Sequence, residues 1–120
     1  NIAAAEVENC LFENQLVSKV ACIAVKDDVR EEEVMACIVL NKDTSKNLKT
    51  AQQLFSHTSK SLAYFKTPGY ILFMDDLPVT GTQKVVKHKI FTSEIDPRSL
   101  KGVFDFRQQK KRKKNGRKKN

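Results

Sequence analysis

Apolar and polar positions change along the first 106 residues with periods that predict helices and strands. Over residues 3–17, AAAEVENCLFENQLV, apolar residues recur at helical spacing while glutamates take other positions, which predicts an amphipathic helix. The runs KVACIAVK (19–26) and VMACIVL (34–40) are short and almost wholly apolar, which is typical of buried strands. Because the link between them is too short for a helical crossover, we expect these two strands to pair antiparallel.

The second half of the same region predicts a further helix and a third strand. Residues 48–62 carry apolar side chains on one side, which predicts a helix capped by Ser45 or Asn47. The stretch YILFM (70–74) is apolar throughout and predicts a strand, whereas KVVKHKIF (84–91) fits a strand or a short helix equally well. Together these elements predict an α+β fold, a small two-layer domain with a short hairpin or three-stranded sheet packed with two to three helices.

The basic charge of the chain is concentrated at its C-terminal end. The 120 residues include 22 Lys and Arg against 14 Asp and Glu, a formal net charge of +8. Residues 107–120, RQQKKRKKNGRKKN, hold nine of the basic residues and no acidic residue, which leaves 13 basic and 14 acidic residues in 1–106. A block of like charges without apolar residues repels itself and buries nothing. We therefore expect residues 1–106 to form one domain and residues 107–120 to be a disordered polybasic tail.

The cysteines and the N-terminal stretch restrict the class of protein further. Cys10, Cys22 and Cys37 lie within or beside apolar stretches and form no CxxC pair, so we expect buried thiols, no metal site and a cytoplasmic protein. No apolar run reaches the roughly 18 residues of a transmembrane helix, and the start lacks the pattern of a signal peptide. Because the chain starts with Asn and enters a helical pattern at once, we expect it to be part of a longer protein.

One lysine follows an unusually stiff segment, LPVTGTQKVVKHKIF, at residues 77–91. Pro78 fixes a backbone dihedral, Gly81 allows a turn that other residues resist, and Lys84 lies three residues after Gly81. A lysine beside a turn is usually a solvated surface charge, and on these residues alone that interpretation stays open.

Nucleophilic catalysis within the chain finds no support in the sequence. His57 and His88 have no serine or cysteine partner in a recognisable motif, so both are expected to be surface residues. A glycine-rich phosphate-binding loop is also missing. The body of the chain therefore offers no self-contained active site.

Four stretches taken in order resemble a known family. NIAAAEVE, VACIAVKDDVREEEVMACIVL, LAYFKTPGYILFMDDLP and VTGTQKVVK are similar to the small C-terminal domain of the adenylate-forming enzymes, the acyl-CoA synthetases and their relatives. The start and the AYFKTP stretch look most like the carnitine/crotonobetaine-CoA ligase and medium-chain fatty-acyl-CoA ligase groups. The resemblance covers residues 1 to about 91 and implies that residues 1–106 are an AMP-binding enzyme C-terminal domain, truncated at its N-terminal end.

The resemblance implies the C-terminal lobe of an acid–CoA ligase. In that family a large N-terminal domain, absent from this sequence, binds the carboxylic acid and ATP with Mg²⁺, and the small domain swings between two poses. Lys84 stands at the position of the catalytic lysine that reaches the carboxylate and the α-phosphate while acyl-AMP forms. In the second pose another face of the small domain shapes the channel for coenzyme A. Lys66 and Lys87 are candidates for contact with a phosphate of the nucleotide or coenzyme A, with a solvated lysine as the open alternative.

The chain departs from the family pattern at two turns. Gln83 stands where the family often has glycine directly before the lysine. In the loop KDDVREEE, Lys26 replaces a proline and Glu31 replaces a glycine, and we expect the second change to tighten or distort the turn on the coenzyme A face. Without its large domain, the chain is not expected to activate any acid.

A rival hypothesis belongs to a different class, a stand-alone, non-catalytic module that binds polyanions. The tail could hold nucleic acid or an anionic membrane by counterion release, without base stacking because it has no aromatic residue. An inert extension and a nuclear address are the other interpretations of the same residues.

Overall fold

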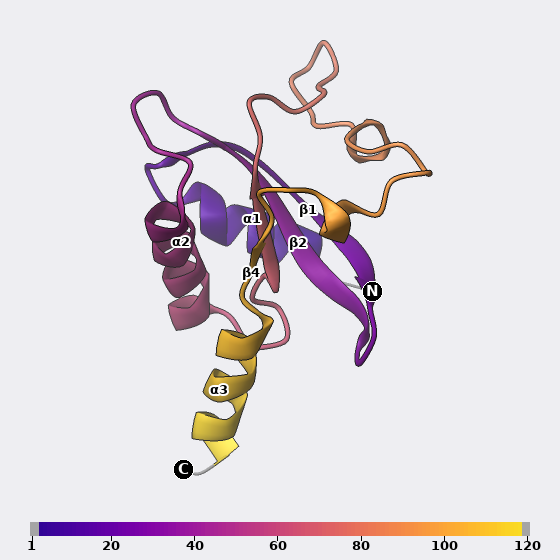
Figure 1. Cartoon of the computed structure of the whole chain (residues 1–120). Coiled ribbons are helices and arrows are strands. Elements are labelled where there is room, and N and C mark those ends of the chain that lie inside the picture. Colours follow the sequence, from indigo (N-terminus) through magenta and orange to yellow (C-terminus); the bar gives the residue numbers. More distant parts are fainter. Residues whose placement is uncertain (1–2, 119–120) are drawn as a thin grey trace.

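The structure, a computed structural model, describes the backbone of residues 3–118 and the side chains of residues 3–112. Helices, strands and two 3₁₀ turns follow one another along the chain (Figure 1). Their bounds are α1 (Ala4–Phe12), β1 (Val17–Asp27), β2 (Glu31–Leu40), α2 (Leu48–Ser61), β3 (Tyr70–Phe73), η1 (Lys87–Lys89), η2 (Pro97–Ser99), β4 (Phe104–Asp105) and α3 (Arg107–Lys118). No helix among the described residues is long and apolar enough to cross a membrane.

The four strands form one mixed sheet in the order β1-β2-β3-β4. Strands β1 and β2 pair antiparallel, as predicted, β2 and β3 pair parallel, and β3 and β4 pair antiparallel. The α+β class is confirmed, but the sheet has four strands instead of three. The two residues of β4 are too few to show a period in the sequence, so only the backbone pairing with Tyr70 and Ile71 identifies this strand.

Both faces of the sheet are buried, which explains why the strand sequences are continuously apolar. Val34, Ala36 and Ile38 of β2 belong to a core cluster with residues of α1 and α2. The alternate residues Met35 and Cys37 belong to a second cluster on the opposite face. That face is covered by the irregular segment 77–103, which contributes Leu77, Val85, Ile90, Phe91 and Val103. The sheet and the helices α1 and α2 thus form two layers. Lys84 lies in segment 77–103, which covers the face of the sheet opposite to these helices.

Several boundaries differ from the prediction for local reasons. α1 ends at Phe12 and not at residue 17, because the side chain of Asn14 accepts a hydrogen bond from the backbone N–H of Leu16 and holds a turn. Of the two predicted caps of α2, Asn47 is the one used, and its Oδ1 accepts from the N–H of Thr50 at 2.9 Å. The three cysteines are free thiols and buried, as expected.

The basic C-terminal segment begins with ordered structure. Arg107–Lys118 forms helix α3. Arg107 pairs with Asp27 at 3.0 Å, and the ammonium group of Lys110 bonds to the carboxylate of Glu33. The structure thus has a helix over residues 107–118, where the sequence predicted a disordered tail, and residues 119–120 lie outside the described part of the chain. Composition revealed the charge of this segment but not the acidic partners that the fold places beside it.

The two positions at which the sequence departs from the glycines of the family that it resembles have left-handed backbone. φ is 69° at Glu31 and 66° at Gln83. A side chain in this region crowds its own carbonyl oxygen at a cost of about 1–2 kcal/mol, which glycine avoids. The turn that ends at Glu31 thus has a backbone conformation that suits glycine, and the side chain of Glu31 makes this conformation strained.

Replacing Glu31 by glycine should therefore raise the free energy of unfolding, by about 0.5–1 kcal/mol, because relief of strain outweighs the greater flexibility of glycine in the unfolded chain. Urea unfolding followed by circular dichroism measures the change. Val29→Gly is the matched control, because Val29 is exposed in the same turn and has no left-handed φ, and we expect it to lower stability by about the same amount. A loss of stability in Glu31→Gly equal to that of the control would contradict the strain.

Candidate functional site

Residues 78–86 form a short, closed arm that carries Lys84 at its outer end. Val79 and Val85 form an antiparallel bridge. The backbone N–H of Val86 donates to the carbonyl of Pro78 at 2.8 Å, and that of Thr80 donates to the carbonyl of Lys84 at 2.8 Å. The hydrogen bonds fix the path of the chain on both sides of the tip, so Lys84 leaves the body from a defined position.

The tip of the arm is polar and exposed. Gly81, Thr82, Gln83 and Lys84 are all exposed, and the N–H of Gln83 donates to the carbonyl of Thr80 at 2.9 Å. Within residues 3–112, the ammonium group of Lys84 has no hydrogen bond or ion pair. Figure 1 shows the arm projecting from one end of the body, with α3 at the other end. The charge of Lys84 is thus available to a partner outside the domain.

Lys87, at the base of the arm, anchors it to the edge of the sheet. Its Nζ donates to the carbonyl of Cys22 at 2.9 Å and pairs with Oε2 of Glu8 at 2.8 Å. The same Oε2 accepts the N–H of Cys22 at 2.8 Å. Because β1 is an edge strand, the outward backbone groups of Cys22 have no neighbouring strand. Glu8 and Lys87 satisfy both groups and join α1, β1 and the arm in one network.

Lys66, the other candidate for contact with a phosphate, lies in a separate set of contacts. Its Nζ bonds to Oε1 of Glu6 at 2.8 Å and lies 5.7 Å from the centre of the Phe65 ring. The structure therefore brings Lys84 and Lys87 together on one loop but ties Lys66 to a different glutamate of α1. Glu8 was not predicted as a site residue, since nothing in its helical spacing distinguishes it from the other early glutamates.

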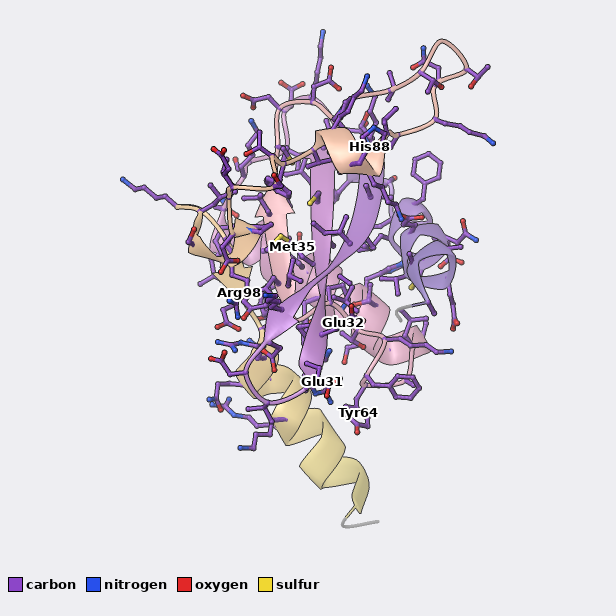
Figure 2. All side chains as sticks on the ribbon, turned by 90° about the vertical axis from the view of Figure 1, so that its right-hand side faces the viewer. Glu31, Glu32, Met35, Tyr64, His88 and Arg98 are labelled. Atoms are coloured by element: carbon purple, nitrogen blue, oxygen red, sulfur yellow. The ribbon has the colours of Figure 1, made fainter. Side chains whose placement is uncertain are left out.

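The two histidines have different surroundings. His88 is exposed on η1, as predicted, and Figure 2 places it at the opposite end of the sheet from Glu31. His57 is half-buried, with Nε2 2.7 Å from the carbonyl oxygen of Cys10. Cys10, Glu13 and His57 bring potential metal-ligating atoms within 4.8 Å of one another. Burial, and then the charge of Glu13, raises the pKa of the Cys10 thiol, which disfavours its thiolate form.

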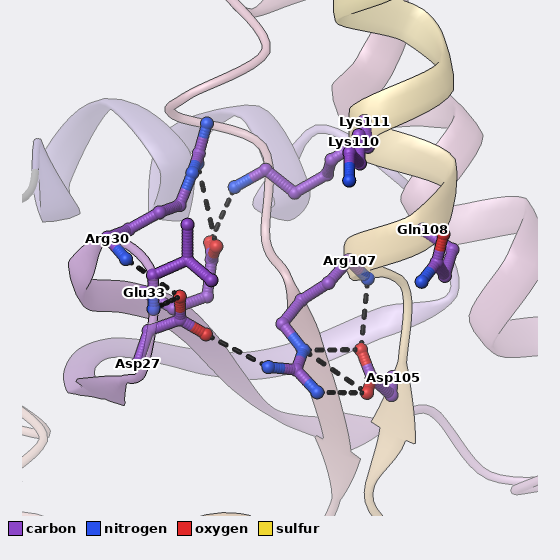
Figure 3. A pocket seen from close by; sticks show the side chains of 9 residues that line it. Asp27, Arg30, Glu33, Asp105, Arg107, Gln108, Lys110 and Lys111 are labelled. Carbon is purple, nitrogen blue, oxygen red and sulfur yellow. Dashed lines mark hydrogen bonds and ion pairs between the residues drawn. The ribbon is translucent and has the colours of Figure 1, made fainter.

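The turn between β1 and β2, at the end of the sheet away from the arm, holds a second charged cluster (Figure 3). A hollow of about 330 Å³ is lined by Asp27, Arg30, Glu33, Arg107 and Lys110 among others. Burial opposes ionisation of Asp27, but hydrogen bonds from the backbone of Arg30 and the side chain of Arg107 outweigh it and lower the pKa of Asp27. Burial lowers the pKa of Lys110, against the opposing effect of Glu33.

Comparison with known proteins identifies the family. The sequence profile of the family described as AMP-binding enzyme C-terminal domain matches residues 6–84, which end at the lysine of the arm. The chain belongs to this family.

Two curated relatives and one solved structure illustrate the match. The chain is 36% identical over 90 residues to the mitochondrial medium-chain acyl-CoA ligase of Danio rerio, covering 75% of this chain and 14% of the relative. It is 30% identical over 90 residues to a crotonobetaine/carnitine–CoA ligase of Salmonella arizonae, covering 75% and 17%. The o-succinylbenzoate CoA synthetase of Bacillus subtilis, solved with its acyl-adenylate intermediate, has a TM-score of 0.66 at 26% identity, covering 78% and 18%. The chain thus spans less than a fifth of the length of each of these proteins.

The anchor predicts a specific effect on the dynamics of the arm. Lys87→Met removes the cation that holds Glu8 and the Cys22 carbonyl, so the amides of Thr80 and Val86 should exchange with solvent about 10-fold faster, the effect of losing one charged hydrogen bond. Hydrogen exchange followed by NMR measures this. Lys89→Met is the matched control, because Lys89 lies on the same 3₁₀ turn and has no ion pair within residues 3–112. Equal exchange in both variants would contradict the anchor.

The shared partner of Asp27 and Asp105 predicts an acid-sensitive stability. Burial opposes ionisation of Asp105 too, and hydrogen bonds from Arg107 outweigh it, so both aspartates have a pKa below the ordinary 3.8. Such groups stabilise the fold above the ordinary pKa, and this contribution is lost as the pH falls through the lowered values. The free energy of unfolding should therefore drop below about pH 4, and Arg107→Gln should make the drop smaller. Urea unfolding over a pH series tests this, and an unchanged drop in the variant would contradict it.

Proposed function

We propose that this chain is the C-terminal lobe of an acid–CoA ligase and supplies Lys84 as the adenylation lysine to an N-terminal domain that binds ATP and the acid. The observation that carries the proposal is the combination of family membership with the geometry of the arm. Lys84 is exposed, unpaired within residues 3–112 and held on a closed, anchored loop. The substrates are then a carboxylic acid, ATP with Mg²⁺ and coenzyme A, bound mainly by the other domain.

The chemistry of adenylation explains why a free lysine is needed. The reaction brings an acid carboxylate toward an α-phosphate that is already negative, and charge builds up at phosphorus in the transition state. A compact, mobile ammonium group suits the bridge between the two anions. Two unit charges about 4 Å apart interact by roughly 4 kcal/mol at an effective dielectric constant near 20, which is enough to matter for the rate. A lysine already paired within its own domain would first have to break that pair.

The second half-reaction uses a different part of the same domain in this proposal. The arm and the β1–β2 turn lie at opposite ends of the sheet, as Figures 1 and 2 together show. A rotation of the domain could therefore remove the arm from a common active site and bring the β1–β2 turn to the same place. The turn then forms part of the coenzyme A channel. Lys66 lines a hollow of about 490 Å³ with residues 30–34, and as our candidate for a phosphate contact there it would first have to leave Glu6.

Lys87 takes a different role from the one that the resemblance suggested. Its ammonium group is bonded to Glu8 and to the Cys22 carbonyl, so we assign it to positioning the arm and not to a cofactor phosphate. The rival function, polyanion binding by residues 107–120, has no observation in its favour. Arg107 and Lys110, two of the cations on which it would rely, bind carboxylates of the body.

The test of the proposal separates the two half-reactions in the polypeptide that contains both domains. Lys84→Ala should slow the formation of acyl-AMP by roughly 10²–10³-fold, the typical loss on removing one transition-state donor. Formation of the thioester from supplied acyl-AMP should change little. Pyrophosphate release measures the first step, and rapid-quench chromatography of the acyl-CoA measures the second.

Lys89→Ala is the matched control for this test, because it removes one exposed, unpaired charge five residues further along the described chain. We expect both half-reactions to keep their rates in the control. An equal loss in both half-reactions of Lys84→Ala would contradict the assigned role and indicate a general defect of the domain.

A further inference from the structure

Helix α3 lies beyond residues 6–84, the part of the chain that the family profile matches, yet it is joined to the body by specific contacts. Phe106, directly before the helix, stacks on Phe55 with ring centres 4.7 Å apart. Gln109 exchanges two amide hydrogen bonds with Gln52 of α2, at 2.8 and 3.0 Å. Neither a polyanion-binding tail nor an inert extension requires these contacts. They give α3 a defined position on the body of the domain.

The deepest of these contacts is an ion pair between Lys110 and Glu33. The side chains are only 3% and 2% exposed, and Oε1 of Glu33 also accepts the N–H of Val34 at 3.0 Å. Gly69 leaves room for this carboxylate, because an added Cβ at that position would lie 2.4 Å from Cδ of Glu33. A buried carboxylate without its cation is strongly unfavourable. Lys110 is thus one of two cations that hold Glu33, together with Arg30 of the turn, whose Nη1 lies 3.5 Å from Oε2 of Glu33.

A second contact from α3 reaches the other strand of the same hairpin. Arg107 pairs with Asp27, at the end of β1, at 3.0 Å, and with Asp105 at 2.9 Å. The side chain of Asp27 is 3% exposed, and its other oxygen accepts the N–H groups of Val29 and Arg30, at 3.1 and 3.0 Å. Arg107 thus holds the aspartate that forms the turn.

The two contacts meet on a turn that carries strain. Glu31 has φ of 69° in this turn, a left-handed conformation that glycine adopts without strain. Lys110 binds the strand that follows the turn and Arg107 binds the strand that precedes it, as Figure 3 shows. Both strands are thereby held by one short helical segment, and opening the turn would break a buried ion pair.

We propose that α3 is a clamp that holds the β1–β2 turn in one conformation, with Lys110 and Arg107 as its positioning residues. The clamp offsets the strain of the left-handed backbone at Glu31. Under the proposed function, on which this step rests, the clamped turn belongs to the coenzyme A channel. The basic segment therefore acts on thioester formation and not on adenylation.

Hydrogen exchange of the whole chain tests the clamp without reference to activity. Lys110→Met removes the cation and keeps most of the side-chain volume, so the amides of Val29 and Arg30 should exchange about 10²-fold faster, the scale expected for breaking a buried pair. The matched control is Lys111→Met, one residue along the same helix, exposed and without an ion pair among the described residues. The control should leave these amides within about 2-fold of the original chain.

A second variant keeps the test valid if Lys110→Met alone unfolds the domain. Glu33→Gln combined with Lys110→Met removes the buried charge that would otherwise keep only its 3.5 Å pair with Arg30, and should restore folding while the turn amides remain faster than in the control. Faster exchange spread evenly over α1, α2 and β3 would show that α3 stabilises the whole fold and would overturn the clamp. Unchanged exchange at Val29 and Arg30 in both variants would overturn it as well.

The link to coenzyme A is tested separately in the polypeptide that contains both domains. Arg107→Gln, at a half-exposed residue, should raise the KM for coenzyme A by about 10-fold and leave the rate of acyl-AMP formation unchanged. If hydrogen exchange confirms the clamp but the KM does not change, the turn does not belong to the coenzyme A channel. If Arg107→Gln also lowers the rate of acyl-AMP formation, the clamp acts on the whole domain, and its assignment to thioester formation alone is wrong. Neither outcome affects the test of Lys84.

Discussion

The contact on which the site depends is the one between the arm and the edge of the sheet at Cys22. An edge strand leaves its outward N–H and carbonyl groups without a neighbouring strand, and here a glutamate of α1 and a lysine of the arm take both places. The same bonds that complete the strand also fix the base of the loop. On the other side of the arm, Leu77 and Val85 pack on the sheet face opposite to the helices. Lys84 is therefore held by both polar and apolar contacts, while its own ammonium group stays unpaired within residues 3–112.

A division of the lysines follows from this arrangement. Lys66, Lys87 and Lys110 each neutralise a carboxylate of the body and so contribute to its structure. Lys84 neutralises none among the described residues and so remains available to an anion brought by another domain. The two ends of the sheet also differ, with an exposed cation at one end and, at the other, a turn that contacts α3 and has left-handed backbone at Glu31. Under the proposed function, this difference would let a rotation of the domain present the arm in one half-reaction and the turn in the other.

The sequence predicted the parts that depend on local patterns and missed those that depend on distant partners. Continuous apolar runs identified β1, β2 and β3, and the cap of α2 was one of two residues proposed. The anchoring role of Lys87 was missed because Glu8 is 79 residues away in the sequence. The order of α3 was missed for the same reason, since Lys110 is 77 residues from Glu33. Composition alone makes such a segment look disordered, because its net charge is visible and its partners are not.

The most direct test of the central claim is the position of the Lys84 ammonium group when an acyl-adenylate is bound. A crystal structure of the polypeptide with both domains and a stable acyl-adenylate mimic should show Nζ within hydrogen-bond distance, about 3 Å, of an oxygen at the adenylate junction. The loop 78–86 should keep its backbone path and the bonds from Lys87 to Glu8 and Cys22. A structure in the adenylation pose in which Nζ of Lys84 points into solvent, while another cation contacts the junction, would contradict the account.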